Sequence, residues 1–558
     1  MLNSKLVSSL EKGFINSDIN SFDTFDSVTV LKNERFSFQL MYTFNEQTDP
    51  LRAMLALKVS GGLSEYARVR EVINLPVLMP VSVYDDNYLS TEPGLYPDLL
   101  EPLHYGGVVS VVRNQTHSVW IEIDLRKVKN ISSGDYTFEV CLCAGDEICA
   151  SHTLNIEVID ACLPPQKMYL TQWFHCDCLA NYYNCPVWSD EHWRIIENFA
   201  TVAKSNGINL LLTPVFTPPL DTAVGGERLT TQLIDVIKTG DIYSFDFSML
   251  DKWINMCDRI GIEYFEISHL FTQWGATHAP KVMAHVDGEY KKLFGWETDA
   301  TSEDYTKFLR TFLSAFLTHM KARGDDKRCL FHISDEPNGE QLDSYRAAKD
   351  SIADLLDGYI IMDALSNYEF YREGIVSTPI PSNNHIEEFI ENDVKDLWTY
   401  YCCGQCVDVS NRLISMPSWR NRSIGMQLYR FNIVGFLQWG YNFYNNMSSC
   451  DAVNPYIEVS GDFWVPAGDA YSVYPASDGT ARESLRIIVF YEALQDMRAM
   501  QLCESLCGRE KVVSAIESAF GQPIKFSKCA HSADEVLRVR DAVNKLIKAS
   551  LTADASEK

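Results

Sequence analysis

Two adjacent carboxylates are the residues of this chain best placed to carry out acid–base chemistry. Asp335 and Glu336 lie in FHISDEPNGE, after the apolar run CLFHIS and before the turn-like PNGE. In folds built on parallel strands, reactive groups lie where the strands end. Pro337 stops the strand, because proline cannot donate to a β-ladder. A solvated Asp–Glu pair at a loop start is the simpler alternative, but the strand-end position favours a catalytic pair.

Side chains suited to binding sugars occur at four other predicted strand ends. Sugars pack their C–H faces on aromatic rings, and their hydroxyl groups need directed donors and acceptors. Taken singly, each aromatic residue is more often part of a core, and His332, within a strand, is expected to be structural. The recurrence at four ends favours a sugar pocket. The candidates are Trp173, His175, Asp177, Trp274, His278, Tyr401, Trp439, Tyr441 and Asn442, with Tyr400 beside Tyr401.

Three regions of different pattern must position these groups. Residues 1–163 alternate apolar and polar positions over short runs separated by turn signals, which predicts an antiparallel β-sandwich. In residues 164–483, eight strand candidates alternate with helical patterns, which predicts a (β/α)₈ barrel. Residues 484–558 are predicted to form a helical appendage. A doubly wound open sheet is the alternative for the middle region, but no glycine-rich phosphate turn follows its first strand.

Composition narrows the classes of partner. With 558 residues the chain is too long for one hydrophobic core, and its formal net charge is −27. Such an acidic surface repels nucleic acid and anionic membranes, so we expect neither as a partner. No apolar run is long enough for a membrane span. The first residues lack the apolar core of a secretory signal, and we therefore expect a cytoplasmic protein.

The sixteen cysteines raise the question of disulfides or a metal. A reducing compartment favours free thiols. Structural zinc needs two ligand pairs at characteristic spacings, and the clusters HCDC (175–178) and CCGQC (402–406) supply only one such spacing, C-G-Q-C. We therefore predict no metal site, and nothing in the sequence implies another cofactor.

Six motifs in order along the chain resemble glycoside hydrolase family 123, especially its branch called domain of unknown function 4091. They are TQWFHCDCLANYYN, HLFTQWGATHAPKVMA, LFGWET, HISDEP, GFLQWGYNFYNN and SLRIIVFYEALQDMRAMQL. The similarity extends over nearly the whole chain. It implies an enzyme like the β-N-acetylgalactosaminidases, acting on a small glycoside or oligosaccharide.

The resemblance also implies a role for each acid. In that family the acetamido carbonyl of the sugar attacks its own anomeric carbon and forms an oxazoline. Asp335 would orient the acetamido group as an ionised carboxylate, and Glu336 would protonate the leaving oxygen and then activate water. Adjacent acids suit this chemistry, because a two-carboxylate retaining enzyme holds its acids about 5 Å apart on opposite sides of the scissile bond.

Two other functions stay open at this stage. The first is a conventional retaining glycosidase, with Glu336 as acid/base and a distant nucleophile such as Glu266 or Asp363. The second is a non-catalytic glycan-binding protein, against which the intact acid pair argues. The leading prediction is an exo-acting retaining β-N-acetylhexosaminidase that prefers GalNAc. The sequence leaves the oligomeric state open.

Overall fold

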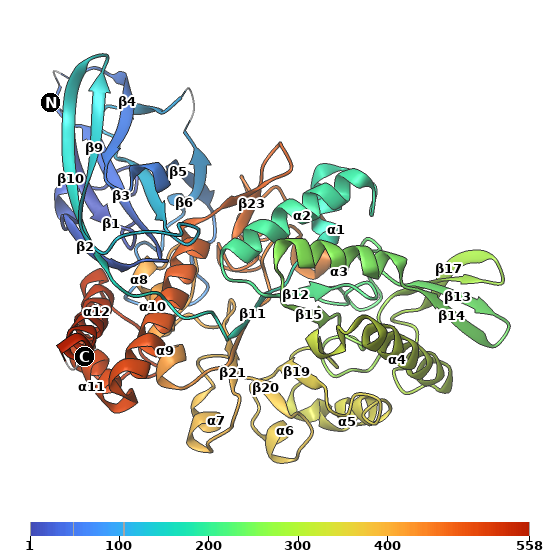
Figure 1. The fold of residues 1–558 in the computed structure, drawn as a ribbon. Coiled ribbons are helices and arrows are strands. Elements are labelled where there is room, and N and C mark those ends of the chain that lie inside the picture. The colour runs from blue at the N-terminus through green and yellow to red at the C-terminus, as the bar shows by residue number, and fades with distance from the viewer. Residues whose placement is uncertain (1, 48, 104–105, 557–558) are drawn as a thin grey trace.

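The computed structural model describes residues 2–47, 49–103 and 106–556 (Figure 1). An N-terminal pair of β-sheets, a central region of parallel strands and a C-terminal group of helices pack side by side, and both chain ends lie on the same side of the molecule. None of the helices in the described ranges is long and apolar enough to cross a membrane.

The N-terminal region consists of two five-stranded sheets, as the alternating pattern predicts. Neighbouring strands are antiparallel except for the β2–β10 pair. Phe38, Ile121 and Val140 from both sheets are fully buried in the core between them. The first sheet has the order β1 (Leu2–Ser8), β3 (Arg35–Phe44), β8 (His117–Asp124), β5 (Ala67–Val77) and β6 (Gly94–Pro102). The second has the order β2 (Ser27–Leu31), β10 (Glu147–Ile159), β9 (Gly134–Ala144), β4 (Arg52–Gly61) and β7 (Val108–Val112).

The central region contains eight parallel strands, but they form two separate hydrogen-bonded sheets instead of one closed sheet. Buried on both faces, these strands are continuous apolar runs such as LLLT, as expected for parallel sheets. The larger sheet has the order β12 (Leu210–Thr213), β15 (Tyr264–Ile267), β18 (Cys329–Phe331), β19 (Ile360–Ala364) and β20 (Thr378–Ile380). The smaller has the order β11 (Tyr169–Gln172), β22 (Gly435–Gln438) and β21 (Trp398–Tyr400).

Helices connect these strands, and their lengths differ widely along the region. The long helix α4 buries residues at three- and four-residue intervals, which is one amphipathic face. In contrast, α6 and α7 are single turns, because prolines at 379 and 381 and Gly374 leave little uninterrupted chain. The helices are α1 (Cys176–Tyr183), α2 (Asp190–Ser205), α3 (Ser248–Ile260), α4 (Glu303–Arg323), α5 (Leu342–Asp350), α6 (Glu369–Arg372), α7 (Glu387–Glu391), α8 (Ser418–Arg422) and α9 (Ile424–Arg430).

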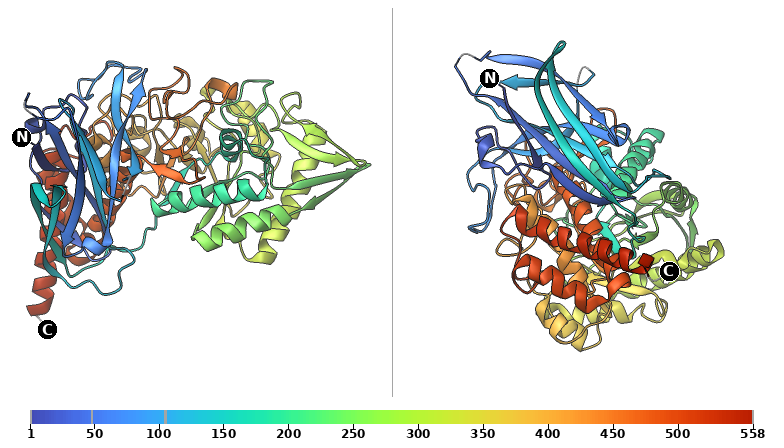
Figure 2. Two further views of the ribbon diagram at one scale, coloured as in Figure 1. Left: turned by 90° about the horizontal axis from the view of Figure 1, so that it is seen from above. Right: turned by 60° about the vertical axis from the view of Figure 1, so that its left-hand side comes forward.

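A small sheet projects from the central region, and the sequence pattern did not predict it (Figures 1 and 2). Two hairpins form it: β13 (Asp235–Thr239) with β14 (Ile242–Asp246), and β16 (Val282–Val286) with β17 (Glu289–Phe294). They join through a short parallel pairing of β13 with β16. These strands are only five or six residues long and bury few side chains, so their hydrophobic signal in the sequence is weak.

The C-terminal helices pack more deeply into the molecule than a helical appendage would. They are α10 (Leu485–Cys507), α11 (Arg509–Phe520) and α12 (Ala533–Ser556), preceded by the hairpin of β23 (Val473–Pro475) and β24 (Ala481–Glu483). Helix α10 is buried along most of its length and packs against α8 and α9 as well as against α11 and α12. Its buried residues lie all around the helix and include charged side chains such as Glu492 and Asp496, which are paired within the protein.

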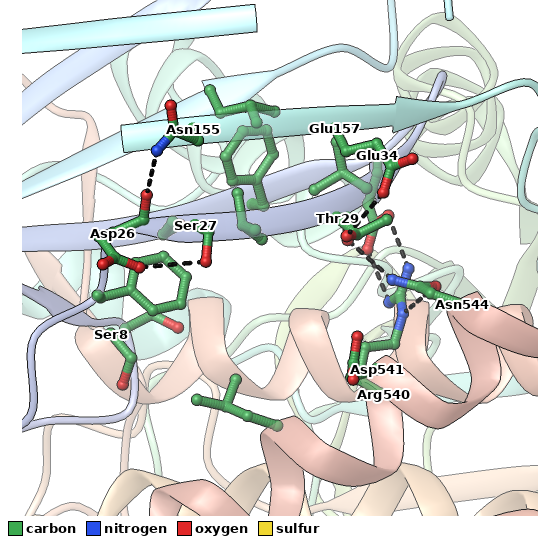
Figure 3. Close-up of a pocket in the computed structure, with 18 of the residues that line it drawn as sticks. Ser8, Asp26, Ser27, Thr29, Glu34, Asn155, Glu157, Arg540, Asp541 and Asn544 are labelled. Atoms are coloured by element: carbon green, nitrogen blue, oxygen red, sulfur yellow. Dashed lines mark hydrogen bonds and ion pairs between the residues drawn. The ribbon is translucent and has the colours of Figure 1, made fainter. Parts of the chain in front are cut away.

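A chain of buried ion pairs joins the sandwich to these helices beside a cleft of about 760 Å³ (Figure 3). Arg540 of α12 contacts Glu34 at 2.7 Å and Asp496 of α10 at 2.9 Å. Arg422 of α8 contacts Asp496 and, at 3.0 Å, Glu492. Because Glu34, Asp496 and Glu492 are each paired with an arginine, we interpret this cleft as a domain interface and look for catalytic acids elsewhere.

One close approach in the smaller sheet gives a test of its packing. Gly435 is in register with Trp398, whose ring stacks on Tyr169 at 5.3 Å, and a Cβ on Gly435 would lie 2.0 Å from that ring. We expect Gly435→Ala to lower the free energy of unfolding by about 3 kcal/mol, because overpacking displaces neighbouring side chains. Urea denaturation measures this change. Gly404→Ala, whose Cβ would meet nothing within 4 Å, is the control; equal midpoints for both variants would contradict the packing.

Candidate active site

The acid pair lies on a tight turn that follows β18. Ser334 Oγ donates to the carbonyl of Thr272 at 2.8 Å, and Glu336 N–H donates to the carbonyl of Ala364 at 3.0 Å. Glu336 has a left-handed backbone with φ of 43°, which is unusual for a residue with a long side chain and is found most often at functional sites. The turn is therefore fixed to the loops after β15 and β19, with Glu336 exposed and Asp335 partly buried.

A buried histidine between two carboxylates supports this turn from below. His332 contacts Glu266 Oε1 at 2.7 Å and Asp363 Oδ1 at 3.0 Å, and all three side chains are fully buried. Burial lowers the pKa of His332, but the hydrogen bonds to Asp363 and Glu266 outweigh it and raise the pKa to about 10. The raised pKa favours the imidazolium form of His332, and both of its ring nitrogens are bonded to carboxylates within the protein. Asp363 also accepts from the backbone N–H of Ile333 at 3.1 Å, which holds the strand end in place.

The same cluster contains a set of ligands at metal-like spacing. Among the described residues, His269, His332 and Asp363 are the group of three whose ligand atoms all lie within 4.8 Å of one another. His269 stacks on His332 with ring centroids 4.2 Å apart. Both ring nitrogens of His332 are already bonded to carboxylates, so His332 has no free nitrogen to offer a metal ion. Neither cysteine cluster forms such a group in the described part of the chain, and none of the sixteen cysteines is in a disulfide there.

Tyr400, at the end of β21, holds the Glu336 carboxylate. Its hydroxyl donates to Glu336 Oε1 at 2.6 Å. Burial and the charge of Glu336 raise the pKa of Tyr400 well above its usual value, so the phenol keeps its proton. A cleft of about 360 Å³ opens here, lined by Glu336, Asn367, His385 and Tyr400 among others. The acid at the cleft is therefore oriented by a neutral donor.

Asp335 lies in a more crowded electrostatic environment than the sequence predicts. Burial, followed by the charges of Glu336 and Asp221, raises its pKa well above the usual range for aspartate, and the charge of His332 opposes this only in part. The expectation of a simply ionised Asp335 is thus not met in the free site. A carboxyl group beside other negative charges is harder to ionise, which accounts for the raised pKa of Asp335 together with its burial.

Known proteins resemble this chain in sequence and in fold. The model of the glycoside hydrolase 123 catalytic domain matches residues 173–503, more than half of the chain. The chain belongs to glycoside hydrolase family 123. This membership supports a glycosidase, and a carbohydrate as the substrate.

One solved structure shares the fold of this chain over almost its whole length. A family 123 glycoside hydrolase from Clostridium perfringens, studied for glycolipid glycan hydrolysis, has a TM-score of 0.74 and 15% identity, covering 99% of this chain and 100% of that one. A family 39 glycoside hydrolase from Bacteroides cellulosilyticus has a TM-score of only 0.31 and 10% identity, covering 80% of each chain. A search of curated proteins gives no significant match.

Several predicted sugar-binding residues of this family 123 chain are buried within a polar network. Arg228 contacts both carboxylate oxygens of Asp177, at 2.7 and 2.8 Å, and lies 3.1 Å from Nδ1 of His175. His175 Nε2 is 3.0 Å from the carbonyl of Trp439. Burial, with help from Arg228, lowers the pKa of His175 to about 3, so the ring is neutral. These groups position the loops after β11 and β22, and their polar atoms are already bonded to protein.

The remaining buried candidates behave in the same way. Trp173 donates to Glu266 at 2.8 Å, and Tyr441 donates to the carbonyl of Phe199 at 2.8 Å. Each side chain is bonded within the protein because the strand ends turn inward there. The structure places six of the nine candidates in the buried interior, with exposed fractions of 3% or less: Trp173, His175, Asp177, Tyr401, Tyr441 and Asn442.

The other three candidates lie nearer the surface. Trp274 is 44% exposed, and its backbone N–H donates to the backbone carbonyl of Asp335 at 2.9 Å, which places its loop beside the acid pair. Trp439 is partly buried, and its indole N–H donates to Asp469 at 2.9 Å. His278 lies against Trp296 with ring centroids 5.8 Å apart. Trp274 and Trp439 are thus the predicted aromatic residues that have both exposure and a link to the site's acids.

The sequence did not indicate two acids of the site, and of two adjacent tyrosines it led to the choice of Tyr401 instead of Tyr400. Asp221 and Asp469 stand in long loops without a strand-end pattern, and each has a raised pKa, about 7 and about 6, chiefly through burial. Asp221 interacts electrostatically with Glu336 and Asp469. For the tyrosines, strand alternation was the available signal: Tyr400 and Tyr401 point to opposite sides, and Tyr401 faces the core.

The two tyrosines give a matched test of the site. Tyr400→Phe removes a hydrogen bond to a charged acceptor, which contributes about 1.5–3 kcal/mol. We expect kcat/KM to fall about 10- to 100-fold without loss of stability. Tyr401→Phe, whose hydroxyl lies 3.3 Å from Asn421 away from the cleft, is the control and should change kcat/KM less than about twofold. Similar losses in both variants would mean that Tyr400 does not act through Glu336.

Proposed function

We propose that the protein is an exo-acting, retaining β-N-acetylhexosaminidase that prefers GalNAc and uses substrate-assisted catalysis. One observation carries the choice of mechanism. The two distant nucleophiles of a conventional mechanism, Glu266 and Asp363, are fully buried and hydrogen-bonded to His332. An anomeric carbon has no access to them, whereas Glu336 lines the cleft and Asp335 directly precedes it on the same turn. An acetamido oxygen supplied by the substrate then takes the place of the missing nucleophile.

Each step of this mechanism has a residue to perform it. Ionised Asp335 accepts the acetamido N–H and stabilises positive charge as the acetamido oxygen bonds to C1. The C1–O bond to the leaving group breaks, and Glu336 gives its proton to that oxygen. Water then attacks C1 and gives a proton to Glu336, and the oxazoline opens to the acetamide with the original anomeric configuration. Tyr400 keeps Glu336 in place through both steps.

We further propose that the two parallel sheets together form the predicted (β/α)₈ barrel. Two hydrogen bonds bridge the gaps between the sheets: Asn209 N–H to the Leu170 carbonyl at 3.2 Å, and Tyr400 N–H to the Pro381 carbonyl at 3.2 Å. The acid pair would then lie at the carboxyl end of the fourth strand, where barrel enzymes carry out catalysis. The proposed domains are residues 1–163, 164–483 and 484–558. The family match continues to residue 503, into α10, which supports close packing of the last two.

The substrate proposed is a glycan or small glycoside with a terminal N-acetylhexosamine. The family 123 relative from Clostridium perfringens was studied for hydrolysis of glycolipid glycans, and the same sugar chemistry is proposed for this chain. The formal net charge of −27 disfavours nucleic acid and anionic surfaces as partners.

The acid/base role of Glu336 has a direct test. We expect Glu336→Gln to lower kcat on an aryl β-N-acetylgalactosaminide about 10²- to 10⁴-fold, the usual contribution of a general acid. Glu340→Gln, an exposed acid on the same loop, is the control and should keep wild-type activity. An N-acetyl thiazoline should inhibit wild type competitively. Covalent trapping by a fluoro-sugar would instead establish the conventional mechanism, and wild-type activity of Glu336→Gln would remove Glu336 from catalysis.

The raised pKa of Asp335 predicts the acid side of the pH profile. Asp335 must be ionised to accept the acetamido N–H, so kcat/KM should rise with pH through the pKa of Asp335 in the free enzyme. Since burial and neighbouring charges raise that pKa, the acid limb should lie well above about pH 4, the ordinary value for aspartate. Kinetics from about pH 3 to 9, with circular dichroism as a folding control, measure the limb. An acid limb near the ordinary aspartate value would contradict the coupling.

A further inference from the structure

A third carboxylate, Asp221, is held beside the acid pair and has no task in the mechanism proposed above. It lies in the loop after β12 and has a left-handed backbone with φ of 45°. Its N–H donates to Gln273 Oε1 at 2.7 Å, and its carbonyl accepts from Ser449 Oγ at 2.7 Å. Side chains from the loops after β15 and β22 thus fix the backbone of Asp221.

The carboxylate of Asp221, in contrast to its backbone, has no hydrogen-bond donor or ion-pair partner among the described residues. The nearby Arg228 is already committed, because it contacts both oxygens of Asp177 and the carbonyl of Leu220 at 3.0 Å. The side chain of Asp221 is only partly buried, so its unpaired carboxylate is open to a donor from outside the chain, while the backbone that carries it is held in place.

The surroundings of Asp221 define the kind of donor. Gln273, which accepts a hydrogen bond from the backbone N–H of Asp221, directly precedes the exposed Trp274. Asp469, whose charge repels that of Asp221, accepts a hydrogen bond from the indole N–H of Trp439. Asp221 therefore lies among segments that carry the two accessible tryptophans. The hydroxyl groups of a sugar ring that packs against these aromatic side chains can supply such donors. A divalent cation is disfavoured, because Asp221 belongs to no group of ligand atoms at metal spacing in the described ranges.

We propose that Asp221 accepts hydrogen bonds from one or two of the hydroxyl groups at C3, C4 and C6 of the sugar whose C1 lies at Asp335 and Glu336. It would thereby determine which hexosamine epimers are accepted. This inference rests on the proposed function, because it assumes that a hexosamine occupies the cleft. Asp221 binds the part of the ring that the two catalytic acids do not reach.

A double comparison of enzyme and substrate tests this role. Wild type and Asp221→Ala are assayed on an aryl N-acetylgalactosaminide and on its 3-, 4- and 6-deoxy analogues. We expect wild type to lose about 10- to 100-fold in kcat/KM on at least one deoxy analogue, as for a hydrogen bond to a charged acceptor. Asp221→Ala should lose less than about twofold on that same analogue. Equal losses by both enzymes on all three analogues would overturn the inference.

Two controls keep the result interpretable. Asp462→Ala changes an exposed aspartate that also has a left-handed backbone, with φ of 60°, and should keep wild-type discrimination. Asp221→Asn keeps the shape of the side chain and one acceptor oxygen, so it should lose discrimination in part even if Asp221→Ala folds poorly.

A binding measurement distinguishes failure of this inference from failure of the proposed function. Calorimetry in a Glu336→Gln background, with free N-acetylgalactosamine and its deoxy forms as ligands, measures the same coupling without turnover. Wild type inactive on every aryl N-acetylhexosaminide would refute the proposed function, while the coupling in Kd would still decide the role of Asp221. Failure of free N-acetylgalactosamine to bind, or deoxy forms binding equally to proteins with and without Asp221, would overturn the role of Asp221.

Discussion

The site depends on a protonated histidine clamped between two buried carboxylates. The positive charge of His332 offsets part of the negative charge of Glu266 and Asp363, and Thr171, Trp173 and Tyr345 complete the hydrogen bonds of those two acids. A buried charge without its partner costs several kcal/mol, so every member of the cluster holds the others in place. Because Asp363 also binds the backbone of Ile333, the cluster fixes the strand end from which Asp335 and Glu336 project.

Above this cluster, carboxylates outnumber the positive groups available to pair with them. Asp221, Asp335, Glu336 and Asp469 repel one another, and the arginines nearby are committed to other partners, Arg228 to Asp177 and Arg412 to Gln172 and Gln438. Such a site suits a ligand rich in N–H and O–H donors. It also suits a transition state with positive charge at the anomeric carbon, which is the kind that glycoside hydrolysis develops. The crowding of carboxylates therefore accounts both for their mutual repulsion and for the suitability of the site for glycoside hydrolysis.

The sandwich contributes to the site indirectly, by bracing its loops. Met79 accepts a hydrogen bond from Ala467 at 3.0 Å, two residues before Asp469, and Asp85 pairs with the buried Arg420 at 3.0 Å. Asp469 in turn holds Trp439 at the cleft. Together with the ion pairs of Arg540 and Arg422, these contacts give a physical reason for the three regions to pack as one body around a shared core.

The sequence by itself determined the sandwich, the eight parallel strands and the position of Asp335 and Glu336, because hydrophobic period and strand-end placement are local properties. It did not determine which polar residues face the cleft. His175 and Asp177 had suitable types and spacing, yet Arg228, more than fifty positions along the chain from both, draws them inward. Asp221 and Asp469 had no distinctive pattern, and strand alternation alone did not say which of Tyr400 and Tyr401 faces the cleft. Their roles depend on contacts between loops distant in sequence, and only the tertiary structure decides those contacts.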